Sequence, residues 1–203
     1  MKKKGLIAIW VGWCLLQPVL YFFGDLLTDI MVLLILAPLF FILLIIQLVK
    51  LIKEMPGVTG LRIGKLLSFM LLFFLTTAPW IVQNVMERID WVILYNKRKE
   101  IVQQVKKGQL KPNQGWSSSL CKLPFALPVV SDGGNEIEIY RNKNNNNALT
   151  VAFWTFRGMP EGGSRSFVYS EDVAEINEMD KKVAQQPGKN RKIQEGWYRL
   201  TDE

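Results

Sequence analysis

Residues 30–46 read IMVLLILAPLFFILLII, an apolar run that only Pro38 interrupts. A helix needs roughly 20 apolar residues to cross the hydrocarbon core of a bilayer, which is about 30 Å thick. The run continues as far as Val49, where Lys50 follows. This stretch therefore predicts a transmembrane helix over residues 30–49, a membrane protein as the fold class, and the lipid bilayer as the first partner.

Two further apolar runs, 5–23 and 66–86, flank this one. Together they predict about three N-terminal transmembrane α-helices, in a transmembrane region that covers residues 1–86. No Asp, Glu, Lys or Arg lies inside any of the three runs. Because charge within the membrane is the usual mark of an ion or proton path, its absence favours an anchor over a transporter.

The bases of the short loops predict the orientation. Lys2–Lys4 precede the first run and the segment 50–65 carries four bases, whereas the link 24–29 has two acids and no base. Lys and Arg are favoured on the cytoplasmic side of a membrane. The sequence therefore predicts a multi-pass protein of the cell membrane, and an odd number of spans places its C-terminal domain outside the cytoplasm. Four bases just beyond the third run are the opposing signal, and one miscounted span would move the domain to the cytoplasm. They are Arg88, Lys97, Arg98 and Lys99.

Residues 87–107 predict a juxtamembrane helix with an apolar stripe, because apolar residues recur at steps of three and four. The stripe comprises Ile89, Val92, Ile93, Ile101, Val102 and Val105. Such a stripe usually faces a core. We therefore expect this helix to pack on the sheet of its own domain, with a free stalk or signalling helix as the alternative.

The rest of the chain predicts a small α+β soluble domain, residues 87–203, with an antiparallel sheet and helices on one face. Residues 111–134 are rich in Pro, Ser and Gly and predict a loop. Residues 171–186 predict a helix with Ser170 as its N-cap. The predicted strands, rich in β-branched and aromatic residues, are 136–140, 148–156, 166–170 and 196–202.

The composition removes several kinds of chemistry. The chain has no histidine, which is the commonest general base and metal ligand. Cys121 has only Lys122 as a local base, and a cysteine nucleophile needs a base to activate it. No metal or phosphate motif is present, and a charge of +3 spread over mixed signs in residues 87–203 argues against nucleic-acid binding. We therefore predict no catalytic, cofactor-binding or metal-binding residues.

The strand ALTVAFWTF, 148–156, suggests a partner surface. Strict alternation would direct Phe153 to one face and both Trp154 and Phe156 to the other, and both faces would be apolar. Such a strand is either covered on both sides or covered on one side by a partner. Trp, Tyr and Arg dominate binding hot spots. The predicted surface comprises Trp154, Arg157, Arg165 and Tyr169.

These features favour a non-enzymatic, membrane-anchored protein whose domain binds a protein partner at the cell envelope. An immunity-type protein or an accessory subunit of an envelope complex would fit. The alternatives are a sensor or transport accessory, in which the membrane helices carry the function, and an enzyme that uses Cys121.

Overall fold

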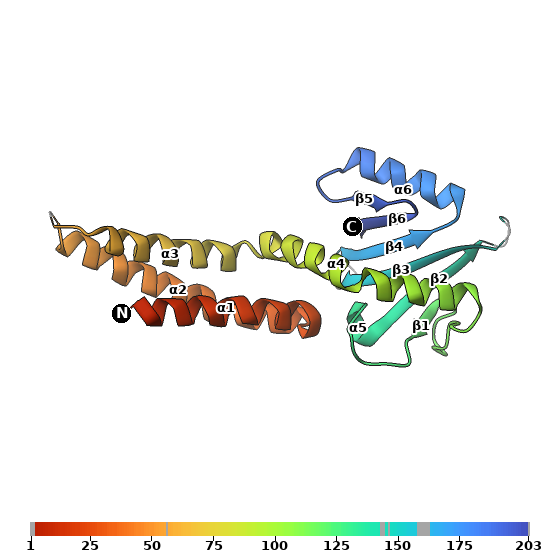
Figure 1. Cartoon of the computed structure of the whole chain (residues 1–203), viewed down its shortest axis with the longest axis horizontal. Coiled ribbons are helices and arrows are strands. Elements are labelled where there is room, and N and C mark those ends of the chain that lie inside the picture. The colour runs from red at the N-terminus through yellow and green to blue at the C-terminus, as the bar shows by residue number, and fades with distance from the viewer. Residues whose placement is uncertain (1–2, 56, 143–144, 146, 158–162, 203) are drawn as a thin grey trace. The chain divides into compact units, whose positions relative to one another are not determined.

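The computed structural model describes residues 3–55, 57–142, 145, 147–157 and 163–202. The chain divides into two compact units, Met1–Ile89 and Asp90–Glu203. Each is described by itself (Figure 1).

The first unit holds three long apolar helices, α1 (Lys3–Phe23), α2 (Leu26–Lys53) and α3 (Gly60–Thr77). By length and composition, each of the three could cross a membrane. Trp13, Phe40, Phe69 and Leu72 are buried together, and the indole nitrogen of Trp13 donates a hydrogen bond to Thr76 Oγ1 at 3.1 Å. Many other large apolar side chains are exposed, which is the pattern expected of a surface that meets lipid.

The third predicted helix, 66–86, differs from the structure. α3 already begins at Gly60 and ends at Thr77, and α4 (Pro79–Lys106) starts after one non-helical residue, Ala78. A proline disfavours the helical conformation in the residue before it, and it suits the first position of a new helix. The predicted juxtamembrane helix 87–107 is therefore the continuation of α4.

The second unit is built on a six-stranded sheet with the order β1-β2-β3-β4-β6-β5, in which every neighbouring pair is antiparallel. Three long apolar helices followed by a small antiparallel sheet domain are thus confirmed. A single turn, α5 (Asp132–Asn135), precedes β2, and α6 (Val173–Gln185) connects β4 to β5. The strands are β1 (Leu120–Lys122), β2 (Glu136–Asn142), β3 (Ala148–Phe156), β4 (Ser164–Ser170), β5 (Arg191–Gln194) and β6 (Trp197–Asp202).

Helices cover both faces of this sheet, so the expectation of helices on one face is wrong (Figure 1). α6 packs Met179 against Ala152, Val168 and Tyr198. On the other face, Trp91 of α4 contacts Phe167 and Trp197, at ring-centroid distances of 5.0 and 5.2 Å. The central strands have two apolar faces, and each face is buried by a different helix.

The C-terminal part of α4 packs on the sheet, as predicted, but only half of the predicted stripe faces it. Ile101, Val102 and Val105 are buried. Ile89, Val92 and Ile93 are exposed, and the buried face is continued by Arg98 and Leu94, about one and two turns before Ile101.

Three local features also differ from expectation. β1 lies within the predicted loop 111–134, and β5 was not predicted. The N-cap of α6 is Asp172, whose carboxylate accepts from Ala174 N at 3.0 Å. Ser170 ends β4 instead, where its hydroxyl pairs with that of Thr150 at 2.7 Å.

Candidate functional site

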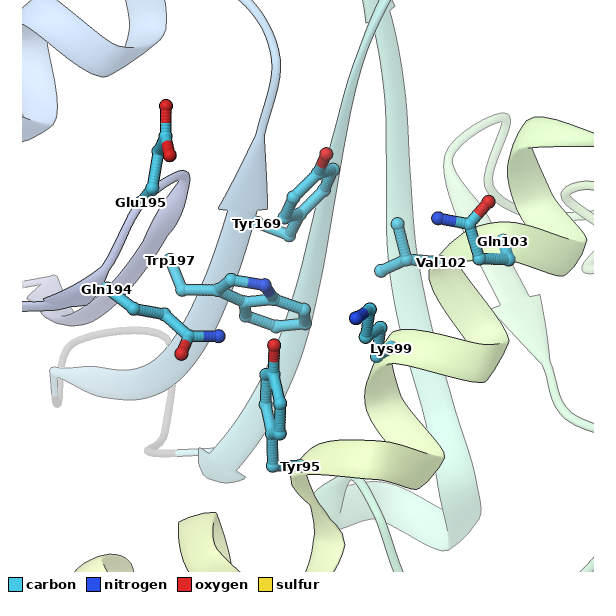
Figure 2. Close-up of a pocket in the computed structure, with 8 residues that line it drawn as sticks. All are labelled: Tyr95, Lys99, Val102, Gln103, Tyr169, Gln194, Glu195 and Trp197. Atoms are coloured by element: carbon cyan, nitrogen blue, oxygen red, sulfur yellow. The ribbon is translucent and has the colours of Figure 1, made fainter.

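A pocket of about 300 Å³ lies between α4 and the β5–β6 hairpin (Figure 2). α4 contributes four side chains spaced by four, three and one residues, which places them on one face of the helix. β4, β5, β6 and the β5–β6 turn contribute the others. The lining residues are Tyr95, Lys99, Val102, Gln103, Tyr169, Gln194, Glu195 and Trp197.

The turn before β6 sets the position of Trp197. Gly196 has φ +70°, and a Cβ there would lie 3.1 Å from Ser170 O. Glycine adopts such a conformation without steric cost. The tight turn brings the Trp197 ring against Tyr169, at 5.1 Å between centroids, and against Tyr95, at 6.1 Å. Three aromatic rings thus form one wall of the pocket.

A polar network closes one end of the pocket. Lys106 Nζ donates to Tyr169 Oη at 2.9 Å, Tyr169 Oη donates to Glu171 Oε1 at 3.0 Å, and Lys106 is also paired with Glu171. Burial lowers the pKa of Lys106, but the hydrogen bonds to Glu171 and Tyr169 outweigh it, so the pKa is raised. Burial likewise raises the pKa of Glu171, yet the bonds from Lys106 and Tyr169 leave it lowered. Both groups are therefore charged near neutral pH.

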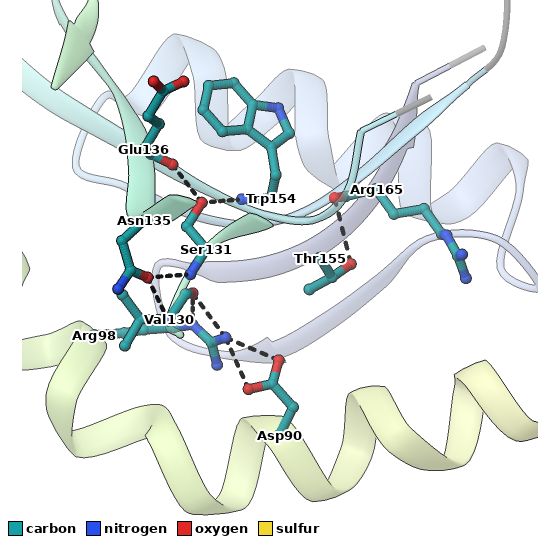
Figure 3. Close-up of polar contacts among 9 residues, drawn as sticks. All are labelled: Asp90, Arg98, Val130, Ser131, Asn135, Glu136, Trp154, Thr155 and Arg165. Atoms are coloured by element: carbon teal, nitrogen blue, oxygen red, sulfur yellow. Dashed lines mark hydrogen bonds and ion pairs between the residues drawn. The ribbon is translucent and has the colours of Figure 1, made fainter. Parts of the chain in front are cut away.

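A buried ion pair fixes the α4 wall to the domain (Figure 3). Arg98 Nη2 donates to both carboxylate oxygens of Asp90, at 2.9 and 2.8 Å. Arg98 Nε and Nη2 also donate to Val130 O, at 3.1 and 2.9 Å. The guanidinium lies 4.7 Å from the ring centre of Phe167. Asn135 holds the loop that carries Val130, because its side-chain oxygen accepts from Val130 N at 2.7 Å.

Three polar groups of the pocket have no partner within the described part of the chain. These are the indole nitrogen of Trp197, the hydroxyl of Tyr95 and the ammonium of Lys99. Among the described residues, only Arg98 Nη1 is both closed off from solvent and without a partner. The Trp197 nitrogen therefore opens on the pocket. The arrangement offers aromatic surface and hydrogen-bond donors to a ligand.

The predicted partner surface does not form one surface, because its four residues lie on two faces of the sheet. Trp154 pairs with Ser166, on the face covered by α6. Tyr169 pairs with Val151 and Trp197, on the face covered by α4. Arg165 lies on the Phe167 side of β4, two residues away, and Figure 3 shows its side chain directed away from Trp154.

Arg165 and Tyr169 follow the regular alternation of β4 onto the α4 face. A β-bulge separately moves Phe156 to that face. The register of β3 with β4 shifts between Trp154 and Phe156, so that Phe156 is opposite Arg165. A bulge inserts an extra residue and reverses the alternation beyond it. Phe156 therefore lies on the α4 face with Arg165, whose guanidinium is 5.1 Å from its ring centre.

Trp154 and Arg157 do lie together on the α6 face. The Arg157 guanidinium stacks over the indole at 3.8 Å, and Arg157 Nη1 also donates to Glu136 Oε2 at 2.8 Å. Its backbone nitrogen donates to Asp132 Oδ2 at 2.9 Å. Trp154 is half-buried. Trp154 and Arg157 thus already have partners, whereas three pocket groups on the other face, those of Tyr95, Lys99 and Trp197, have none among the described residues.

Cys121 is fully buried in β1. Burial raises the pKa of its thiol, which disfavours the thiolate that a cysteine nucleophile requires. Two further acids have structural partners: Glu138 accepts from Ser119 Oγ at 3.2 Å, and Asp172 caps α6. Among the described residues, no group of three or more Cys, Asp or Glu side chains could hold a metal ion.

Sequence reasoning identified Tyr169 but did not assign Tyr95, Lys99 or Trp197 to a site. Tyr95 and Lys99 are four residues apart, and with Val102 and Gln103 they repeat at helical spacing. This signal was present in the sequence, but nothing in the sequence pairs that face of α4 with Trp197, some 100 residues further along the chain. Comparisons with protein-family models, with curated proteins and with solved structures found no match.

Proposed function

We propose that the chain is a non-enzymatic, membrane-anchored binding protein whose sheet domain holds a protein partner in the aromatic pocket of α4 and the β5–β6 hairpin. The observation that carries the proposal is the set of three rings with unpartnered donors in one cavity. Tyr and Trp are enriched in binding hot spots, and well-packed pockets concentrate binding energy. The pocket lies at the small end of the range for ligand sites.

The anchor supports a role at a membrane. α1, α2 and α3 supply the apolar length for three spans, and the basic residues cluster in the last turn of α2 and the first turns of α3. With this α2–α3 link in the cytoplasm, the sheet domain lies outside it, at the cell envelope. The partner is then a protein of the envelope, as for an immunity-type protein or an accessory subunit.

Site-specific photocrosslinking in intact membranes tests the proposal. A photoreactive amino acid replaces Gln194 at the pocket, Trp154 on the opposite face, or the exposed Glu178 of α6 as a control, each in a separate chain. We expect a discrete adduct from position 194 and none from position 178. Tyr95→Ala, which removes one ring of the pocket, should abolish that adduct.

The alternatives give different patterns. An adduct from position 154 that Tyr95→Ala leaves intact would place the partner on the Trp154–Arg157 surface and contradict the pocket. The same adducts from all three positions would mean unspecific proximity. If the chain were a sensor or transport accessory, its function would depend on the identity of the membrane helices instead.

A further inference from the structure

The inner wall of the pocket holds a hydrogen-bond donor without an acceptor. Trp197 is 3% exposed, yet its indole nitrogen makes no hydrogen bond to any residue that the structure describes. The nitrogen is open to the pocket rather than sealed from solvent, and the indole nitrogen of a largely buried tryptophan usually finds an acceptor. The cavity therefore suits a ligand that brings an acceptor to this nitrogen.

Two further donors face the same cavity. The ammonium of Lys99 and the hydroxyl of Tyr95 come from α4, and Figure 2 shows both directed toward the side of the pocket where the Trp197 ring lies. The nearby carboxylates of Glu171 and Glu195 do not accept hydrogen bonds from these donors. Glu171 is engaged by Lys106 and Tyr169, and Figure 2 shows the Glu195 carboxylate pointing away from the indole.

A carboxylate matches this donor set. It is an acceptor through both oxygens, and its hydrogen bonds to an ammonium are strengthened by charge. The rings of Tyr95, Tyr169 and Trp197 offer apolar surface to a group beside it. A single terminal residue supplies both an apolar side chain and a carboxylate, which suits a cavity of about 300 Å³.

We infer that the pocket binds the C-terminal carboxylate of the partner protein, with the apolar side chain of its last residue against the three rings. This inference rests on the proposed function and names the part of the partner that enters the pocket. Lys99 and the indole nitrogen of Trp197 bind the carboxylate, and the hydroxyl of Tyr95, one turn before Lys99 on α4, donates a further hydrogen bond.

Fluorine NMR on the full chain in lipid nanodiscs tests it. The seven tryptophans carry 5-fluorotryptophan, and Trp197→Phe identifies the Trp197 signal. The probes are N-acetyl-Gly-Gly-Phe with a free carboxylate, the same peptide as its C-terminal amide, and 3-phenylpropionate. We expect the acid peptide to shift the Trp197 signal saturably and to bind about tenfold more tightly than the amide.

Lys99→Gln changes an exposed side chain and should remove most of this preference while the other tryptophan signals stay unchanged. Equal binding of acid and amide would overturn the carboxylate inference and leave the pocket as a binding site, which the crosslinking tests separately. If 3-phenylpropionate bound as tightly as the acid peptide, the ligand would be a free carboxylic acid, not a protein terminus. No shift of the Trp197 signal with any probe would also overturn the inference.

Discussion

Asp90 and Arg98 form an ion pair that is 1% exposed on each side. Removing one partner leaves an uncompensated buried charge, which costs about 3–5 kcal/mol. We expect Asp90→Ala to lower the unfolding free energy of the sheet domain by about that amount, measured by denaturant unfolding in detergent with tryptophan fluorescence. Glu100→Ala breaks the exposed pair with Lys97 on the same helix and should cost under about 1 kcal/mol. Equal costs would contradict the buried pair.

Phe153 and Trp154 are neighbours on opposite faces of the sheet. Phe153 is fully buried, and a buried Phe→Ala change costs about 3–5 kcal/mol. Trp154 is half-buried beneath Arg157, so Trp154→Ala should cost clearly less in the same unfolding measurement. If the two substitutions destabilised the domain equally, Trp154 would belong to the core.

The placement of some single residues could not be predicted from the sequence. Alternation along residues 148–156 places Phe153 and Trp154 correctly, but it fails at Phe156 because a bulge depends on the partner strand. Asp90 and Arg98 carry charge, and charged residues are almost never fully buried unless they are paired. Their burial depends on the pairing with each other and on Val130, which lies 32 residues beyond Arg98. Neither arrangement is visible in a local pattern.

Among the elements, α4 decides whether the pocket exists, because it supplies half of its lining. Ile101 is fully buried and Ile93, on the same helix, is 65% exposed. We expect Ile101→Ala to destabilise the domain by about 2–5 kcal/mol, and the matched Ile93→Ala to change its stability by no more than about 0.5 kcal/mol. If unfolding measurements found no cost for Ile101→Ala, α4 would be a free stalk.

The link between Lys106 of α4 and Glu171, just after β4, should make stability depend on pH in both directions. The lowered pKa of Glu171 contributes stability above its unfolded value of about 4.3, and this is lost as pH falls through the folded pKa. The raised pKa of Lys106 contributes below about 10.4 and is lost as pH rises through the folded pKa. When the unfolding midpoint is measured as a function of pH, Lys106→Met should reduce the loss of stability at both the acidic and the alkaline end. The effect should be small because the pair is partly exposed. An unchanged pH dependence would mean that the pair contributes nothing.

The elements that could be predicted are those with a strong local pattern. β2, β3, β4 and β6 were all expected from their β-branched and aromatic residues, and α1 and α2 from apolar length. β1 and β5 are short edge strands of three and four residues, too brief to show alternation. Pro79 indicates the helix break at Ala78, but the residues on both sides are apolar, so the sequence was interpreted as one continuous helix.

For the chain as a whole, the proposed topology of three membrane crossings places the sheet domain outside the cytoplasm. The bases of residues 50–65 should stay in the cytoplasm. We expect alkaline phosphatase fused after Glu203 to be active outside the cytoplasm, as measured in intact cells. An inactive phosphatase, with a cytoplasmic reporter active at the same position, would exclude three crossings in this orientation.

In the proposed function, binding resides in the sheet domain and the membrane helices only anchor it. Replacing residues 1–86 with an unrelated three-span anchor of the same orientation, in the chain with the photoreactive residue at position 194, tests this most directly. We expect the same adduct in the same yield, and its loss with Tyr95→Ala. Disappearance of the adduct from a correctly folded domain on the new anchor would place the function in the membrane helices and contradict binding by the sheet domain alone.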